Sequence, residues 1–398
     1  MQRILTFLLM FYAVTLAACA GVPERPAKVD MPPVVSAKPA PQAEVTLSAL
    51  TISASPAAVD VDAPSLKLEA ASPATAANAH IALLLPLKSP AFGRAAEVVK
   101  QGFMAGASLQ SGALPVTVYP SGSETDDIVA TYLQATQAGA SVVVGPLTRN
   151  GVSALAASTL VSVPTLALNL PEQGGEYPSQ LYVFGLAADV EARQMARTAF
   201  SEGGREAVVI ASDNTLSKRI QQAFTEEWRA LGGYAVRHLV FTGSNPTEVR
   251  DALRRLTPNV VFLAMDSRDA RFLNPFLKSD LPTYATSQIY AGSGSLQKYH
   301  DLNGIQFVDM PWLLQPDHLA VMVYPRSESF LTADLERLYA LGIDAWRLAL
   351  QLQSTPPGMS FTLDGVTGQL TLDVRTHQIK RDGLRAKFSE GEAILSAP

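Results

Sequence analysis

From His80 onward, short continuous apolar segments alternate with longer stretches whose apolar positions recur at helical spacing. The segment Ile81–Pro86 carries no charge and predicts a buried strand. The stretch Ala95–Leu109 predicts a helix, with Ser89 as its N-terminal cap and Pro90 at its first position. Continuous apolar strands of this kind are typical of parallel sheets covered by helices.

The same strand and helix unit returns in two series along the chain. The first series predicts strands at 116–119, 142–146, 165–168 and 181–184, with helices near 126–138 and 152–159. The second predicts helices at 187–202, at 216–231 and after Asn245-Pro246, with strands at 207–211, 234–241, 260–264 and 283–285. This alternation predicts an α/β protein with two Rossmann-like lobes built on parallel sheets. Three later segments, 305–308, a long helix at 331–352 and a hairpin at 361–374, are expected to be distributed over both lobes.

The N-terminus has the anatomy of an export signal. Residues 1–18 hold a basic residue and then an apolar run that is too short to span a bilayer. Ala17-Ala18 precedes Cys19, the only cysteine of the chain, and this pattern resembles the lipobox of bacterial lipoproteins. We expect Cys19 to be acylated, and Ala20 after it favours the outer membrane. The alternative is an ordinary signal peptide followed by an incidental cysteine.

Residues 19–78 differ sharply in composition from the remainder of the chain. From Ala20 to Asn78 there are nine prolines and fifteen alanines, and no aromatic residue occurs between Tyr12 and Phe92. Such a segment buries too little apolar surface to offset its loss of conformational entropy. We therefore expect a lipidated, disordered linker ahead of a two-lobed domain at 79–398. Val45–Leu47 and Leu66–Leu68 leave open one or two short strands within it.

Charge and cysteine content exclude several function classes. The formal net charge is −5, without a long basic run, so the sequence predicts no nucleic-acid partner. One cysteine excludes an internal disulfide and a zinc site made of cysteines. The five histidines show no metal-binding spacing, so we expect neither a metal nor a cofactor; they are His80, His238, His300, His318 and His377.

Motifs for catalysis are weak. Ser295–Lys298 matches S-x-x-K and Ser212–Asn214 matches S-D-N, two of the three motifs of serine penicillin-binding enzymes. Their order is reversed, however, and no K-T-G motif occurs. No nucleophile elbow, phosphate-binding loop or H-E-x-x-H motif is present either. We therefore expect a protein that is not an enzyme.

Several segments resemble those of known families. The strand openings and the segments Gly342–Trp346 and Gly365–Leu372 resemble the type I periplasmic solute-binding fold. More narrowly, the chain from 79 to 398 is similar to the LppC/LpoA lipoproteins, through Val144–Leu147, Leu166–Asn169, Ser287–Gly292, Phe307–Leu314 and Ile379–Arg381. This resemblance implies an outer-membrane lipoprotein on the periplasmic side, which binds and activates a class A penicillin-binding protein. It also implies that the linker stands where longer members carry a helical-repeat domain.

The resemblance to solute-binding proteins implies a ligand cleft beyond the carboxyl ends of the strands. The polar residues at these exits are Ser89, Ser121, Thr148, Asn169, Asp213, Asp266, Gln288 and Tyr290. In amino-acid receptors of this fold, first-lobe hydroxyls and amides hold the ligand carboxylate and a second-lobe acid holds its ammonium. Asp213 or Asp266 is the candidate for that acid, and a tethered receptor for an amino acid or peptide-like solute is the alternative function. For each residue taken singly, the sequence favours a helix cap over a ligand contact.

The division at residue 78 predicts the outcome of limited proteolysis. We expect early cleavage within residues 19–78 and a stable fragment beginning near His80, because chain without packed side chains is open to proteases. Mass spectrometry of the fragments checks this. Early cleavage within 80–350, or a protected linker, would contradict the proposed boundary.

Overall fold

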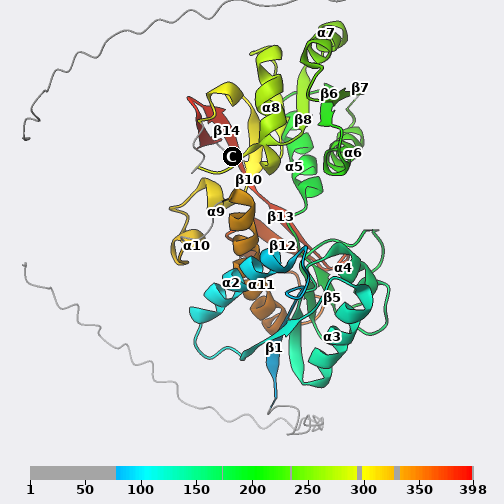
Figure 1. Cartoon of the computed structure of the whole chain (residues 1–398), viewed down its shortest axis with the longest axis vertical. Helices are drawn as coiled ribbons and strands as arrows, with labels where there is room; N and C mark the ends of the chain where they lie inside the picture. Colours follow the sequence, from blue (N-terminus) through cyan, green and yellow to red (C-terminus); the bar gives the residue numbers. More distant parts are fainter. Residues whose placement is uncertain (1–77, 173, 234, 294–297, 327–331, 397–398) are drawn as a thin grey trace, which may run out of the picture. The chain divides into compact units, whose positions relative to one another are not determined.

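The computed structural model describes residues 78–172, 174–233, 235–293, 298–326 and 332–396. The signal peptide, Cys19 and almost all of the linker lie outside these residues. Two sheets, each with its own helices, make up the described part (Figure 1). Within that part, no helix is both long enough and apolar enough to cross a membrane.

The first lobe contains a sheet of eight strands in the order β11-β12-β13-β5-β4-β3-β1-β2. Five parallel strands come from the first series: β1 (His80–Leu85), β2 (Val116–Pro120), β3 (Ala140–Val144), β4 (Thr165–Ala167) and β5 (Leu181–Val183). Three strands from the end of the chain complete it: β11 (Thr362–Asp364), β12 (Gln369–Asp373) and β13 (Gln378–Asp382). Its helices are α2 (Gly93–Ser108), α3 (Thr125–Gln137) and α4 (Arg149–Ala156).

The second lobe contains a sheet of seven strands in the order β15-β14-β10-β9-β8-β6-β7. The strands are β6 (Glu206–Ser212), β7 (Ala235–Phe241), β8 (Val260–Ala264), β9 (Thr283–Ala285), β10 (Gln306–Asp309), β14 (Leu384–Ser389) and β15 (Glu392–Leu395). The longer helices are α5 (Ala188–Ser201), α6 (Thr215–Ala230) and α7 (Pro246–Leu256). Shorter ones are α8 (Ser267–Leu273), α9 (Pro311–Leu314), α10 (Leu319–Met322) and the 3-10 turns η1 (Asn274–Phe276), η2 (Ser287–Ile289) and η3 (His300–Leu302).

The helix α11 (Ala333–Ser354) belongs to the cores of both lobes. Its early residues pack into the second lobe, whereas Trp346 and its neighbours pack into the first against Phe103 of α2. The backbones of α2 and α11 approach closely because glycines meet there. A Cβ on Gly102 would lie 1.9 Å from the Tyr339 carbonyl oxygen, and one on Gly342 would lie 2.1 Å from that of Val99.

The chain passes between the two sheets three times. The first passage lies between β5 and α5, and the second between β10 and β11, a stretch that includes α11. The third is a single residue, because β13 ends at Asp382 and β14 begins at Leu384. Gly383 therefore joins a strand of one sheet directly to a strand of the other.

The predicted α/β architecture with two parallel-dominated sheets is confirmed, and the later segments are shared between the lobes as expected. Two helix starts differ from the prediction. The helix α2 begins at Gly93, four residues after Ser89, whose hydroxyl accepts the Phe92 N–H at 3.3 Å in a turn that precedes the helix. The long helix begins at Ala333 instead of 331, with Thr332 as its cap. The strands β13, β14 and β15 were not predicted from the hydrophobic pattern.

Candidate functional site

A buried ion pair joins the two lobes. Arg381 of β13 donates from Nη2 to Oε1 of Glu191 on α5 at 2.6 Å, and both side chains are almost fully buried. The other carboxylate oxygen of Glu191 accepts the backbone N–H of Ser287 at 3.0 Å. Arg381 also donates to the carbonyl of Thr367 at 3.2 Å. One carboxylate thus holds a first-lobe strand and a second-lobe turn together.

A second residue of α5, Gln194, binds the one-residue passage at Gly383. The Gln194 side-chain amide donates to the Gly383 carbonyl at 2.8 Å and accepts the Gly383 N–H at 3.1 Å. Both backbone polar groups of Gly383 are satisfied by this one side chain. A Cβ on Gly383 would lie 2.7 Å from Cγ2 of Val308, so the site has no room for a side chain.

A second buried ion pair fixes α11 to the second lobe. Arg337 donates to Oδ2 of Asp309 at 2.6 Å and to Oδ1 at 3.2 Å. It also donates to the carbonyls of Ser287 and Tyr290, at 3.1 and 2.8 Å. Burial alone would lower the pKa of the Arg337 guanidinium, but the Asp309 carboxylate beside it raises that pKa above its ordinary value. The carboxylate therefore favours the charged form of Arg337, whereas burial raises the pKa of the Asp309 carboxyl itself.

A third buried acid holds the hairpin of β11 and β12. Asp344 of α11 accepts the backbone N–H groups of Val366 and Thr367, at 3.1 and 2.8 Å, and the Thr367 hydroxyl at 2.6 Å. Arg347 lies 3.2 Å from the same carboxylate. Burial raises the pKa of the Asp344 carboxyl. Together the three acids link α5, α11, the hairpin and β13.

The first-lobe residues expected at a ligand cleft lie at the strand exits, in two neighbouring pairs. The Lys88 N–H donates to the Ser121 carbonyl at 2.9 Å, which brings the loops of Ser89 and Ser121 together. Asn169 donates to the Leu147 carbonyl at 3.0 Å and so lies beside the loop of Thr148. The Thr148 hydroxyl is buried and has no hydrogen-bond partner among the described residues.

In the second lobe, Asp213 and Asp266 are not the buried acids that we expected from the sequence. Asp213 is exposed and pairs with Lys218 at 2.7 Å, a contact that lowers the pKa of Asp213. Asp266 is exposed as well, and its carboxylate caps α8 by accepting the Asp269 N–H at 2.9 Å. Neither is a buried acid. The cap explanation therefore describes Asp266.

Two further second-lobe candidates lie at the turn η2. Tyr290 is buried among Tyr299, Phe307 and Phe388, and burial raises the pKa of its phenol. Gln288 is half-buried on the same turn. The S-D-N serine, Ser212, donates its hydroxyl to Asp269, and Ser295 of the S-x-x-K match lies outside the described residues.

A cavity of about 740 Å³ lies where α4, α5 and β13 meet, between the lobes. Its lining includes five basic side chains and three acidic ones: Arg149, Arg193, Arg197, Lys380 and Arg381, with Glu172, Asp189 and Asp382. Nε of Arg381 is buried there without a hydrogen-bond partner among the described residues. None of the eight predicted cleft residues lines this cavity, although Thr148 and Asn169 each precede a lining residue. The lining therefore carries charges of both signs.

The described residues contain no group of three or more histidine, cysteine, aspartate or glutamate side chains placed to hold a metal ion. The buried acids Glu191, Asp309 and Asp344 are surrounded by arginines and N–H groups instead, which satisfy their oxygens without a metal ion. They therefore have a structural role between the elements that they contact.

A family model described as the LppC lipoprotein matches residues 55–251 and 247–391. Among curated proteins, the penicillin-binding protein activator LpoA of Vibrio cholerae is 27% identical over 336 residues, which cover 74% of this chain and 54% of that protein. LpoA of Pantoea ananatis is 29% identical over 302 residues, covering 64% and 44%. The chain thus spans about half the length of the curated relatives it matches.

Solved structures show the same relationship. The C-domain of LpoA from Haemophilus influenzae, described as a regulator of PBP1A, is 25% identical with a TM-score of 0.69, covering 80% of this chain and 100% of that domain. A protein of Chromobacterium violaceum, named provisionally as a branched-chain amino acid ABC transporter, is 37% identical with a TM-score of 0.68. The match covers 78% of this chain and 99% of that one.

From the buried ion pair of Glu191 and Arg381, which joins the two lobes, we predict a large loss of stability for Glu191→Gln. This change removes one charge of a buried pair and leaves Arg381 uncompensated, which costs about 3–5 kcal/mol of unfolding free energy. Urea denaturation followed by circular dichroism measures it. Asp213→Asn, which breaks an exposed pair, serves as the control and should change the unfolding free energy little. Equal losses in the two variants would contradict the role given to Glu191.

Proposed function

The chain belongs to the LppC lipoprotein family, and we propose that it binds and activates a class A penicillin-binding protein without catalysing a reaction itself. The observation that carries this proposal is the match to proteins named as penicillin-binding protein activators, which runs through both lobes. The partner is therefore a peptidoglycan synthase. Activation requires that the chain bind an active conformation of this synthase more tightly than an inactive one.

The use of the buried acids supports the non-catalytic part of the proposal. Glu191, Asp309 and Asp344 are each engaged by arginines, N–H groups or hydroxyls of the joint. A general acid or base needs a carboxyl group that is free to exchange a proton with a substrate. These carboxylates instead hold elements of the two lobes in place.

We propose that the protein is anchored to the outer membrane, on its periplasmic face, through acylated Cys19. The family is one of lipoproteins, and Ala17-Ala18-Cys19 supplies the matching sequence pattern. In this proposal the linker of residues 19–78 separates the lipid from the two-lobed domain. Two or three acyl chains give stable anchoring where a single one does not.

A solute receptor is the second candidate function. Two observations favour it: the cavity between the lobes, where Arg381 Nε has no partner among the described residues, and the 37% identity to the Chromobacterium violaceum protein. The five bases and three acids of the lining suit the two charges of an amino-acid or peptide-like solute. Asp213 and Asp266, the acids expected to hold the ammonium group, are exposed and do not line the cavity.

The anchor is tested by Cys19→Ser. We expect this variant to lose all incorporation of labelled palmitate, because a serine hydroxyl does not replace the thiol in thioether formation. Fractionation should move the variant from the outer membrane to the soluble periplasm. Wild-type labelling of the variant would contradict the lipoprotein proposal.

The activator proposal predicts little effect of the variant Asp213→Ala/Asp266→Ala, because both side chains are exposed. We expect the detergent-solubilised full chain to stimulate glycan polymerisation by a class A synthase, and the double variant to stimulate within a fewfold of wild type. Circular dichroism must show the fold intact, because Asp266 is a helix cap worth about 0.5–2 kcal/mol. A submicromolar solute bound by the wild-type chain, together with no synthase binding by that chain, would overturn the activator proposal.

A further inference from the structure

A basic groove lies on the second lobe, at the edge of the sheet opposite to the strand exits. We define it by α7 on one side and by residues 275–282, between η1 and β9, on the other. Thr257–Asn259 closes it just ahead of β8. The groove has a volume of about 750 Å³, within the range of about 300–1,000 Å³ typical of ligand pockets. Because β8 and β9 are parallel, their starts share this edge, away from the joint between the lobes.

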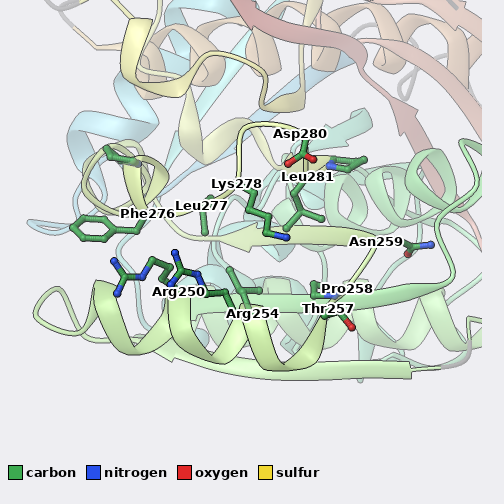
Figure 2. A pocket seen from close by; sticks show the side chains of 13 residues that line it. Arg250, Arg254, Thr257, Pro258, Asn259, Phe276, Leu277, Lys278, Asp280 and Leu281 are labelled. Carbon is green, nitrogen blue, oxygen red and sulfur yellow. The ribbon is translucent and has the colours of Figure 1, made fainter.

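The floor of the groove is apolar and rigidly held. Leu253 of α7 is 7% exposed and belongs to the core, against which Leu277 and Leu281 also pack. Phe276 stands at one end of the groove (Figure 2). Prolines 258, 275 and 282 line it as well, so these positions offer no backbone N–H. An occupant would gain affinity by burying apolar side chains on this floor.

The rim of the groove is basic. Arg250 and Arg254 lie one turn apart on α7, and Lys278 stands on the facing wall (Figure 2). Both arginines approach a single acid, Asp251, at 3.1 and 3.9 Å, and the side chain of Arg254 remains 64% exposed. Asp280 is the only acid among the lining residues, against three bases. Since the whole chain carries −5, this local excess of positive charge attracts an acidic partner that the rest of the surface would repel.

We propose that the basic groove binds an acidic segment of the synthase, whose apolar side chains enter the floor while its carboxylates meet Arg250, Arg254 and Lys278. This inference rests on the proposed function and adds the surface and the chemistry of the contact. A peptide segment fits both the apolar floor and the basic rim, because one chain can direct apolar side chains toward the floor and acidic side chains toward the rim. Exposed charge pairs at the rim of an interface act mainly on association rate and on salt dependence.

The test compares two charge-matched double variants of the full chain in detergent. Arg250→Glu/Arg254→Glu reverses the groove, whereas Arg229→Glu/Arg255→Glu reverses two exposed arginines of α6 and α7 that do not line it. Binding to the purified synthase is measured by surface plasmon resonance at two salt concentrations. We expect the groove variant to bind at least tenfold more weakly and with less salt dependence, and the control to stay within twofold of wild type.

Lys278→Glu, a change in an exposed loop, provides an independent variant that leaves α7 intact. It should weaken binding severalfold, and circular dichroism reports the fold of all variants. Binding of the groove variant within twofold of wild type would overturn the groove assignment alone. Absence of synthase binding by the wild-type chain would overturn the proposed function and the inference with it. Two other outcomes for the groove variant would also overturn the groove assignment, if its synthase binding is unchanged. Loss of self-association in sedimentation would assign the groove to a second copy of the chain, and loss of binding to anionic phospholipid vesicles would assign it to a lipid surface.

Discussion

The described structure depends on one electrostatic requirement: a carboxylate that is buried away from water needs a positive charge or hydrogen-bond donors beside it. Glu191 is buried at the joint and receives Arg381 from the first lobe and the Ser287 N–H from the second. Leaving any of these groups unmatched is costly, so each specifies the position of the others. The same Ser287 also offers its carbonyl to Arg337, which connects this ion pair to that of Asp309. These contacts therefore form one connected network that includes both lobes.

The hydrophobic pattern was enough to predict both sheets because most of their strands are buried on both faces and appear as uninterrupted apolar runs. The strand β13 escaped prediction for the opposite reason. Its sequence, Gln378–Asp382, is polar at almost every position, and Arg381 is buried only because Glu191 faces it. The partners lie 190 residues apart. The local hydrophobic pattern of the sequence does not reveal a pairing between such distant residues. Short helices such as α9 and α10 escaped prediction because they are below the length at which a helical pattern is recognisable.

The site was predictable in part, and through a different signal. Three of the five segments on which the family resemblance rests contribute to the buried ion pairs: Ser287–Gly292, Phe307–Leu314 and Ile379–Arg381. Part of what makes the family recognisable thus also fixes elements of the two lobes. The polar residues of the predicted cleft follow strands of the two sheets, as the sequence indicated. A residue that caps a helix and a residue that binds a ligand can have the same local sequence, however, as Asp266 illustrates.

The passage at Gly383 has a mechanical consequence. A link of one residue has two soft dihedral angles, and the Gln194 amide holds both of its backbone polar groups. Rotation of one lobe against the other has to twist these two angles and break that clasp at the same moment. Any turn of one lobe against the other therefore costs these two hydrogen bonds as well as the ion pair of Glu191 and Arg381.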